Sequence, residues 1–212
     1  MMLARVADSL YWIGRYVERA EHVARLADVM LTATLDRAET AAQVARIALS
    51  AVGDATPEKI ATPFESARAL ALDRLDGSSV VSSLALAREN ARQVRDQITS
   101  ETWERLNLVH LRLSGATAAK SFNDGSSAFL HDIIADLHLF KGAADATMSH
   151  GEGWRFLLLG AHLERAQLIG RLLEVCFGRG GERLDHPTLT AVLRMGCALE
   201  PYLRVYTADV RA

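Results

Sequence analysis

The chain has 212 residues, of which 50% are apolar and 24% are charged, and its formal net charge at pH 7 is −2. This length is enough to bury one substantial core, and the interspersed charges lack the basic footprint of a nucleic-acid-binding protein. No apolar run reaches the length of a membrane span. The composition therefore argues against nucleic acid or a membrane as the partner.

Cysteine usage and the first segment bear on the compartment. The spacing of the two cysteines, Cys176 and Cys197, matches no metal-binding pattern, and such low usage is typical of a reducing compartment. Charged residues run through the first helical segment from Arg5 onward, so the N-terminus resembles neither a signal peptide nor an anchor. We therefore expect a cytoplasmic protein.

Apolar residues recur at steps of three and four along most of the chain, which is the spacing of amphipathic helices. No segment alternates in the manner of a β-strand, so we predict an all-α fold, an antiparallel helical bundle. Thr56 and Pro57 are expected to begin the first of two short helical pieces in residues 57–74, divided at Pro63. Residues 114–126 are small and polar and are predicted to form a loop. The longer helices are predicted at 3–35, 36–52, 80–98, 101–113, 127–148, 154–177 and 187–206.

One stretch is repeated. The segment SLYWIGRYVERAEHVARLADV at residues 9–29 returns in weaker form at residues 154–175. A repeat at this distance is longer than a solenoid unit of roughly 20–50 residues, and we interpret it as duplication of a half-domain. The chain is then a single domain, 1–212, with repeat 1 at about 3–60, central helices at about 78–148 and an incomplete repeat 2 at about 152–212. The matched residues share the offset 160 − 14 = 146, and they include Gly14 with Gly160, Glu18 with Glu164, Arg19 with Arg165, and Arg25 with Arg171.

The repeated glycine and glutamate predict local structure. Glycine inside a helix costs about 0.5–1 kcal/mol relative to alanine, so Gly14 and Gly160 indicate that another helix backbone passes close to each. Glu21 and Arg25 form an i,i+4 pair in the favourable order. Glu164 stands among leucines, and we expect it to lie at least partly inside, where a carboxylate needs a cation or hydrogen-bond donors.

Three stretches carry a recognisable signature. They are residues 9–29, LARENARQVRDQITSETWERLN at 86–107, and LFKGAADATMSHGEGWRFLLLGAHLERAQLIGRLLEV at 139–175. Together they resemble the alpha-E domain family, a bacterial all-helical family named for its helices and recurrent glutamates. Family members are usually longer and complete the second repeat, so this chain resembles a C-terminally short member.

The resemblance also implies partners. Members of the family are typically encoded beside, or fused to, a circularly permuted ATP-grasp peptide ligase and a transglutaminase-like cysteine peptidase. A role in making or modifying a peptide or amide-linked product follows, and self-association is a further option. The positions that match the family's recurrent polar residues are Arg15, Glu18, Arg19, Glu21, Arg25, Arg88, Glu89, Asn90, Arg92, Arg95, Asp96, Glu101, Trp103, Asn107, Asp145, Thr147, Glu152, Trp154, Glu164, Arg165 and Arg171.

The first functional hypothesis is an accessory scaffold or substrate-binding module of an ATP-grasp peptide ligase system. Arg19, together with the arginines at 88, 92 and 95, would line a groove between helices and hold a carboxylate or phosphate, while nearby glutamates orient them or bind an amino group. The alternative for the same residues is a buried ion-pair network that sets the register of the helices. The predicted ligand-binding residues are Arg15, Glu18, Arg19, Glu21, Arg25, Arg88, Glu89, Asn90, Arg92, Arg95, Glu164, Arg165 and Arg171.

The second hypothesis is enzymatic. Glu18 and Glu164 are the candidates for general acid–base or metal-assisted chemistry, provided that the duplication brings the two carboxylates together in a buried site. The sequence assigns no catalytic residue beyond these two candidates, and we consider a non-catalytic partner of the ligase the better interpretation.

Metal and cofactor signals are weak. Glu18 and His22 are four residues apart and do not form the E-x-x-H motif of ferritin-like bundles. His131 and His138 are two turns apart on one helix face, with acidic residues nearby, but no second ligand cluster accompanies them. The glycine-rich segment at 178–181 does not contain the lysine that a phosphate-binding loop requires. We therefore expect no metal and no cofactor.

Overall fold

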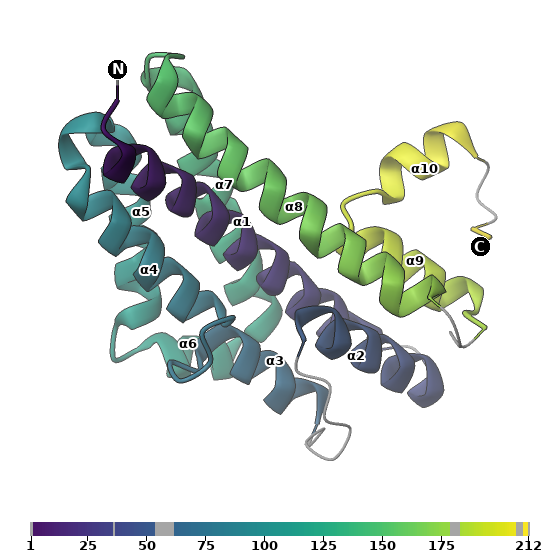
Figure 1. The fold of residues 1–212 in the computed structure, drawn as a ribbon. Helices are drawn as coiled ribbons and strands as arrows, with labels where there is room; N and C mark the ends of the chain where they lie inside the picture. Colours follow the sequence, from purple (N-terminus) through teal and green to yellow (C-terminus); the bar gives the residue numbers. More distant parts are fainter. Residues whose placement is uncertain (1, 36, 54–61, 179–182, 207–209, 212) are drawn as a thin grey trace.

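The computed structural model describes residues 2–35, 37–53, 62–178, 183–206 and 210–211 (Figure 1). Within these ranges the chain forms α-helices and no β-strand, which confirms the predicted all-α fold class. The helices are α1 (Ala4–Ala33), α2 (Ala38–Val52), α3 (Pro63–Leu72), α4 (Val80–Gln93), α5 (Ser100–Ser114), α6 (Ala118–Asp124), α7 (Ser126–Thr147), α8 (Glu152–Phe177), α9 (His186–Met195) and α10 (Leu199–Val205).

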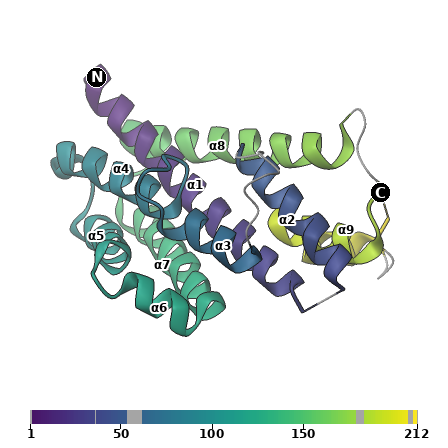
Figure 2. The same ribbon diagram turned by 90° about the horizontal axis from the view of Figure 1, so that it is seen from below.

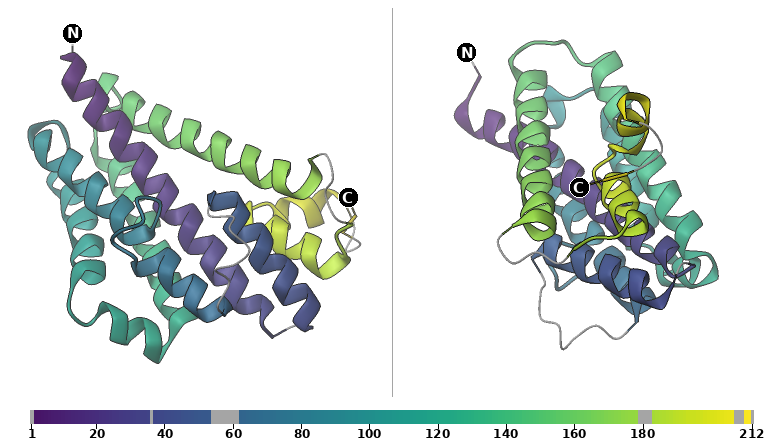
Figure 3. Two further views of the ribbon diagram at one scale, coloured as in Figure 1. Left: turned by 60° about the horizontal axis from the view of Figure 1, so that its bottom comes forward. Right: turned by 90° about the vertical axis from the view of Figure 1, so that its right-hand side faces the viewer.

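Helix α1 is the centre of the molecule. It packs against α8, α4, α7, α3 and α2, and Figures 2 and 3 show it crossing the molecule diagonally, with α4–α6 on one side and α9 on the other. Its apolar stripe is almost completely removed from water, because neighbouring helices cover α1 on several sides. The stripe consists of Leu10, Ile13, Val17, Ala20, Ala24 and Ala27, each at most 1% exposed.

Local sequence signals set several helix starts. In four helices the residue before the first turn accepts a hydrogen bond from a backbone N–H three residues later, which satisfies a donor that the helix itself leaves unpaired. These capping residues are Thr62 for α3, Ser79 for α4, Thr99 for α5 and Asp185 for α9.

Pro63 marks the start of α3, at the position where a missing N–H costs nothing. The proline that divides residues 57–74 in the sequence therefore begins the second helical piece. The first piece, with its expected start at Thr56 and Pro57, lies outside the described residues.

The prediction of a loop over residues 114–126 is wrong in its centre, where the chain forms α6. Ala118 and Phe122 lie one turn apart and are both buried, and the ring of Phe122 contacts the rings of Phe64 and Phe129. Tertiary packing of this small apolar face stabilises a helix that is too short to form by itself.

Two helices predicted as continuous are divided. The helix predicted at 80–98 ends as α4 at Gln93, and a 3₁₀ turn at Arg95–Gln97 leads into α5. Val94 and Ile98, on either side of that turn, are both buried, so the bend keeps both side chains in the core. The helix predicted at 187–206 is divided into α9 and α10 by a turn in which Cys197 has a φ of 55°.

Helices α1 and α8, which carry the two copies of the repeated motif, run in the same direction where they cross (Figure 1). A Cβ added to Gly14 would overlap the carbonyl oxygen of Leu157, and one added to Gly160 would overlap that of Tyr11. The predicted close backbone is therefore confirmed at both glycines, and each glycine lies against the other helix. Only glycine allows helix backbones to approach so closely, so this contact sets the distance between the residues that follow it.

Gly160→Ala should destabilise the protein by about 1–3 kcal/mol, because the added methyl group meets a backbone carbonyl of α1 that cannot move aside cheaply. Denaturant unfolding followed by circular dichroism measures the free energy of unfolding. Gly142→Ala on α7 is the matched control, since a Cβ there meets no atom within 4 Å. That control should gain about 0.5–1 kcal/mol, and equal stability of the two variants would contradict the close crossing.

Candidate functional site

The matched Glu-Arg dipeptides of α1 and α8 exchange partners across the crossing. Arg19 Nε donates to Glu164 Oε1 at 2.7 Å, and Arg165 Nε donates to Glu18 Oε1 at 2.5 Å. Arg15 Nε adds a second donor to Glu164, at Oε2. Glu18 is 4% exposed and Glu164 is 2% exposed, which confirms the expected burial of Glu164. The glutamate of each motif copy is thus held inside the molecule by the arginine of the other.

Helix α7 joins this network through a lysine. Lys141 Nζ lies 2.6 Å from Glu18 Oε2 and 2.5 Å from Glu21 Oε2, so it bridges two buried carboxylates. Glu21 Oε1 accepts a hydrogen bond from Arg25 at 2.9 Å, which confirms the predicted i,i+4 pair, and lies 3.2 Å from His138 Nε2. The ion pairs therefore connect α1, α7 and α8.

The contacts between α1 and α7 follow one antiparallel register. His131 Nε2 lies 2.9 Å from Asp28 Oδ2, two turns away from the contact between His138 and Glu21. A step of seven residues on α7 matches a step of seven on α1, so the two histidines share a helix face as their spacing predicts. Both of them contact carboxylates of α1.

The ionisation of Glu21 is set by its surroundings. Burial alone raises the pKa of this carboxyl, but the charge and hydrogen bond of Lys141 and the hydrogen bond from Arg25 outweigh burial and lower the pKa to about 2. Glu21 therefore remains negative at neutral pH and holds Lys141 in place.

His22 lies in the same part of α1 but has no hydrogen-bond partner at Nε2 within the described part of the chain. The side chain is 8% exposed. Burial lowers the pKa of His22 to about 4, with Glu18 and Glu21 acting against that shift and Arg25 acting with it. The ring is thus neutral at pH 7, and its unpartnered nitrogen destabilises the folded state.

A hollow of about 250 Å³ opens beside Glu18, between α1, α7 and α8. Lys141 and Arg165 line it together with Glu18, and Asp145 and His162 are the other polar residues of the lining. The remaining lining is aliphatic and aromatic, with Val17, Phe140, Trp154, Leu157 and Leu158 as its larger side chains.

The network carries more positive than negative charge. Arg165 and Lys141 are its most accessible cations, with 51% and 30% of their side chains exposed, and both line the hollow. Surplus positive charge beside an apolar hollow suits an anionic group attached to an apolar body. The carboxylates are Glu18, Glu21 and Glu164, and the cations paired with them are Arg15, Arg19, Arg25, Lys141 and Arg165.

The two carboxylates considered for catalysis, Glu18 and Glu164, have both oxygens engaged. Arg165 and Lys141 hold the oxygens of Glu18, and Arg15 and Arg19 hold those of Glu164. A general acid or base must reach the substrate proton directly or through one water, and these carboxylates are committed to cations instead. The geometry therefore favours binding or helix register over acid–base chemistry.

The arginines predicted from the middle stretch lie on α4 and the turn after it, and two of them, Arg88 and Arg95, contact α5. Arg88 donates to the side chain of Asn107, and Arg88 and Arg95 each lie over the ring of Trp103. None of these contacts involves the buried glutamates. The arginines predicted to line one groove therefore make contacts in two different places. Arg19 contacts Glu164 on α8, whereas Arg88 contacts Asn107 on α5.

The remaining predicted residues also make contacts away from the buried glutamates. Glu89 and Arg92 form an exposed ion pair on α4, and Asn90 donates to the carbonyl of Leu86. Arg171, which matches Arg25 in the repeat, donates to the carbonyl of Val52 at the end of α2.

Sequence reasoning missed Lys141, which holds the centre of the network. A usable signal was present, because Lys141 follows His138 by three residues and so lies on the same helix face as the two histidines. It is also one of only three lysines in an arginine-rich chain, the others being Lys59 and Lys120.

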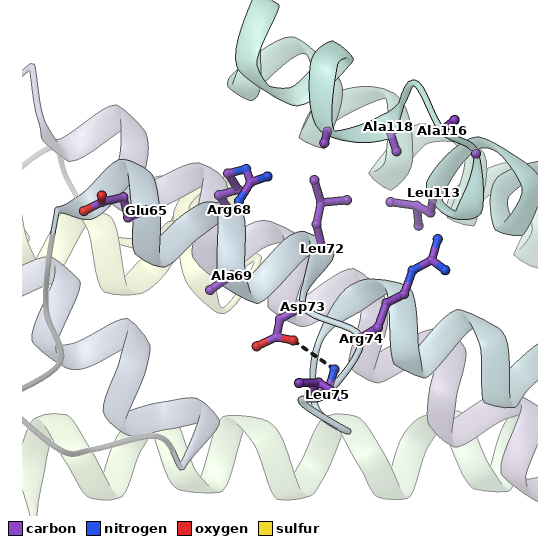
Figure 4. Close-up of a pocket in the computed structure, with 12 residues that line it drawn as sticks. Glu65, Arg68, Ala69, Leu72, Asp73, Arg74, Leu75, Leu113, Ala116 and Ala118 are labelled. Carbon is purple, nitrogen blue, oxygen red and sulfur yellow. Dashed lines mark hydrogen bonds between the residues drawn. The ribbon is translucent and has the colours of Figure 1, made fainter.

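A second hollow, of about 570 Å³, lies between α3 and the connection from α5 to α6 (Figure 4). None of the predicted site residues lines it. Asp73 accepts a hydrogen bond from the backbone of Leu75, and Arg74 donates to the carbonyl of Ser114. Asp73 thus stabilises its own turn, and Arg74 connects that turn to the end of α5.

Three negative findings apply to the described residues. No group of three or more His, Cys, Asp or Glu side chains is placed to hold a metal ion there. None of the helices in those ranges combines the length and the apolar character needed to cross a membrane. Cys176 and Cys197 are both free thiols.

Comparison with known proteins adds a family context. A family model, Alpha-E, described as a predicted alpha-helical domain with a conserved ER motif, matches residues 2–212. Two Glu-Arg dipeptides of this chain, at 18–19 and 164–165, form the exchanged ion pairs. No solved structure gave a significant match.

The curated relatives are mycobacterial and uncharacterised. A protein of Mycobacterium bovis is 30% identical over 207 residues, which is 80% of this chain and 22% of that protein. Two proteins from strains of Mycobacterium tuberculosis are 30% and 29% identical with the same coverage. The chain thus spans less than a quarter of the length of the relatives it matches.

Glu164→Ala should lower the free energy of unfolding by about 3 kcal/mol, because it leaves Arg15 and Arg19 largely buried without their counter-ion. Urea unfolding measures the change. Glu89→Ala is the matched control, since it removes an equivalent partner of arginine from an exposed pair, and it should leave stability essentially unchanged. A change for Glu164→Ala no larger than that of the control would show that the exchanged pairs do not support the fold.

His22→Leu should flatten the pH dependence of stability. The folded-state pKa of about 4 lies below the unfolded value of roughly 6.5, so the unfolded chain binds the proton first as the pH falls. The contribution of neutral His22 is complete above about pH 6.5 and is lost as the pH falls toward 4, by up to about 3 kcal/mol. Unfolding free energies between about pH 7 and 5 check this expectation. Identical slopes in the parent and the variant would contradict it.

Proposed function

Because this chain belongs to the alpha-E family, we propose that it is a non-catalytic scaffold and substrate-binding module of a peptide-ligase system. One observation carries the proposal. The exchanged Glu-Arg pairs occupy both buried carboxylates, while Lys141 and Arg165 remain accessible at the wall of an apolar hollow. Such a site binds a ligand without reacting with it.

The ligand class follows from the lining of the hollow. Lys141 and Arg165 would bind a carboxylate, and the guanidinium of Arg165 is suited to a bidentate contact. Trp154 and Leu158 would contact the apolar part of the ligand, and Asp145 would accept an amino group. A volume of about 250 Å³ admits one or two amino-acid residues rather than a large cofactor. A short peptide or an amino acid is therefore the proposed substrate.

The partners follow from the resemblance to a family encoded beside ATP-grasp ligases and transglutaminase-like peptidases. In this scheme the ligase forms the amide bond, and the present chain holds the peptide that is extended or modified. The cytoplasmic location expected from the sequence suits a reaction that consumes ATP.

Arg165→Ala should weaken the binding of a short peptide with a free C-terminal carboxylate by about tenfold or more, because a charge-assisted hydrogen bond contributes about 1.5–3 kcal/mol. Isothermal titration calorimetry with that peptide and its C-amidated form measures the effect. The amidated peptide should bind weakly to both proteins. Arg92→Ala removes an arginine from an ion pair away from the hollow and should bind like the parent. Equal binding of the two peptides by the parent chain would contradict a carboxylate site.

The partner role requires a separate experiment. An ATP-grasp ligase from the same genome should co-purify with this chain, and its peptide-dependent ATP hydrolysis should increase when the chain is added. No complex and unchanged ligase activity would refute the scaffold role. Amide formation by the purified chain with ATP alone would instead refute the non-catalytic assignment.

A further inference from the structure

The outer face of α8 is apolar and uncovered. Leu159, Leu163, Leu173 and Phe177 are 48%, 47%, 49% and 51% exposed, and a Cβ built at Gly170 would meet no atom within 4 Å. Figure 3 shows α8 along one edge of the molecule, with α1 on its inner side. Apolar side chains gathered on one exposed helix face are unusual in a monomer and mark an interaction site.

The repeated motif allows the exposed face of α8 to be compared with the matching face of α1. At the offset of 146 residues, the exposed positions of α8 match positions of α1 that are at most 1% exposed, in the core where other helices pack against α1. The same motif face is therefore covered by a helix in one copy and bare in the other. The matches are Leu159 with Ile13, Leu163 with Val17, Ala166 with Ala20, Gly170 with Ala24, and Leu173 with Ala27.

The spacing on α8 is that of a coiled-coil seam. Apolar and small residues alternate at steps of three and four through three heptads, and no charged residue interrupts them. A partner helix is the element that such a seam accommodates. The seam consists of Phe156, Leu159, Leu163, Ala166, Gly170, Leu173 and Phe177.

We propose that two copies of this chain pair through this face, with their α8 helices antiparallel. In that alignment Leu163 of one copy lies opposite Ala166 of the other, and Leu159 lies opposite Gly170. Large side chains thus meet small ones in the central layers, which is the condition for close packing. The face is complementary to itself, and a C2 dimer requires this of its interface.

The ends of the helix also match. A hollow of about 700 Å³, lined by Met2, Tyr11 and Phe156 among others, lies at the start of α8, while Phe177 projects at its end. Antiparallel pairing brings Phe177 of each copy to the hollow of the other. An exposed aromatic ring and an apolar hollow are the usual parts of an interface anchor.

Charge supports the same orientation. Arg155 stands near the start of α8 and Glu174 near its end, and both are exposed. Antiparallel pairing places Arg155 of one copy at the same end as Glu174 of the other, whereas parallel pairing places each of these two residues beside the same residue of the other copy.

Sedimentation equilibrium of the 212-residue chain tests the pairing. The parent should be a dimer at about 100 µM, and Leu163→Glu should raise the dissociation constant at least about tenfold, because it places a charge in the seam. Leu108→Glu on α5 is the control, since Leu108 is 56% exposed away from α8, and it should dimerise like the parent. A monomeric parent, or a dimer that Leu163→Glu leaves intact, overturns the proposal.

Disulfide trapping tests the orientation. Leu159→Cys and Gly170→Cys are made separately in a Cys197→Ser background, with tags of different size, and are mixed and oxidised. Antiparallel pairing predicts mainly mixed cross-links, because residues 159 and 170 of one copy lie about 16 Å apart along the helix and cannot bridge to themselves across the dimer. Cross-links of each variant mainly to itself would refute the antiparallel arrangement.

Discussion

The arrangement of this protein depends on the contact between two helix backbones at Gly14 and Gly160. Where the backbones of α1 and α8 touch, the residues one turn further along must also be neighbours, and in both helices those residues are Glu-Arg. A buried glutamate without a cation is strongly destabilising, so each glutamate has to find its partner across the crossing. The exchange between Glu18 and Arg165 and between Glu164 and Arg19 is the result.

This exchange limits what the charged residues can do. Buried ion pairs add little net stability compared with apolar packing, but they penalise every register in which a partner is missing. The network therefore favours one register of α8 against α1. The ion pairs of Lys141 with Glu18 and Glu21 fix the register of α7 against α1 in the same way. The hollow lies where the network reaches the surface, beside the partly exposed Lys141 and Arg165. Position and surplus charge together support the proposal that a ligand binds at this end of the network.

Some features of the fold and of the site could be predicted because they are encoded locally. Each of these features depends on a few neighbouring residues. They are the polar cap three residues before the N–H that it accepts from, the proline in the first turn of a helix, and the leucines around Glu164. The helix α6 could not be predicted in the same way, because Phe122 forms it by packing against Phe64 and Phe129, which are distant in sequence. Lys141 escaped prediction for a related reason, since its partners are more than a hundred residues away. Arg88 and Arg95 are arginines like those of the network, but they contact α5 and none of the buried glutamates.

The sequence by itself determined the helical class, most helix positions, the paired motif and the need to bury Glu164 with a cation. These properties depend on the spacing of apolar residues and on the cost of an unpaired charge, and both can be read along the chain. Only the tertiary structure decided which arginine serves which glutamate, that a lysine of α7 joins them, and that the motif face buried on α1 is bare on α8. Those outcomes depend on how helices cross in space, because a side chain's partners are set by the crossing and not by its neighbours in the chain.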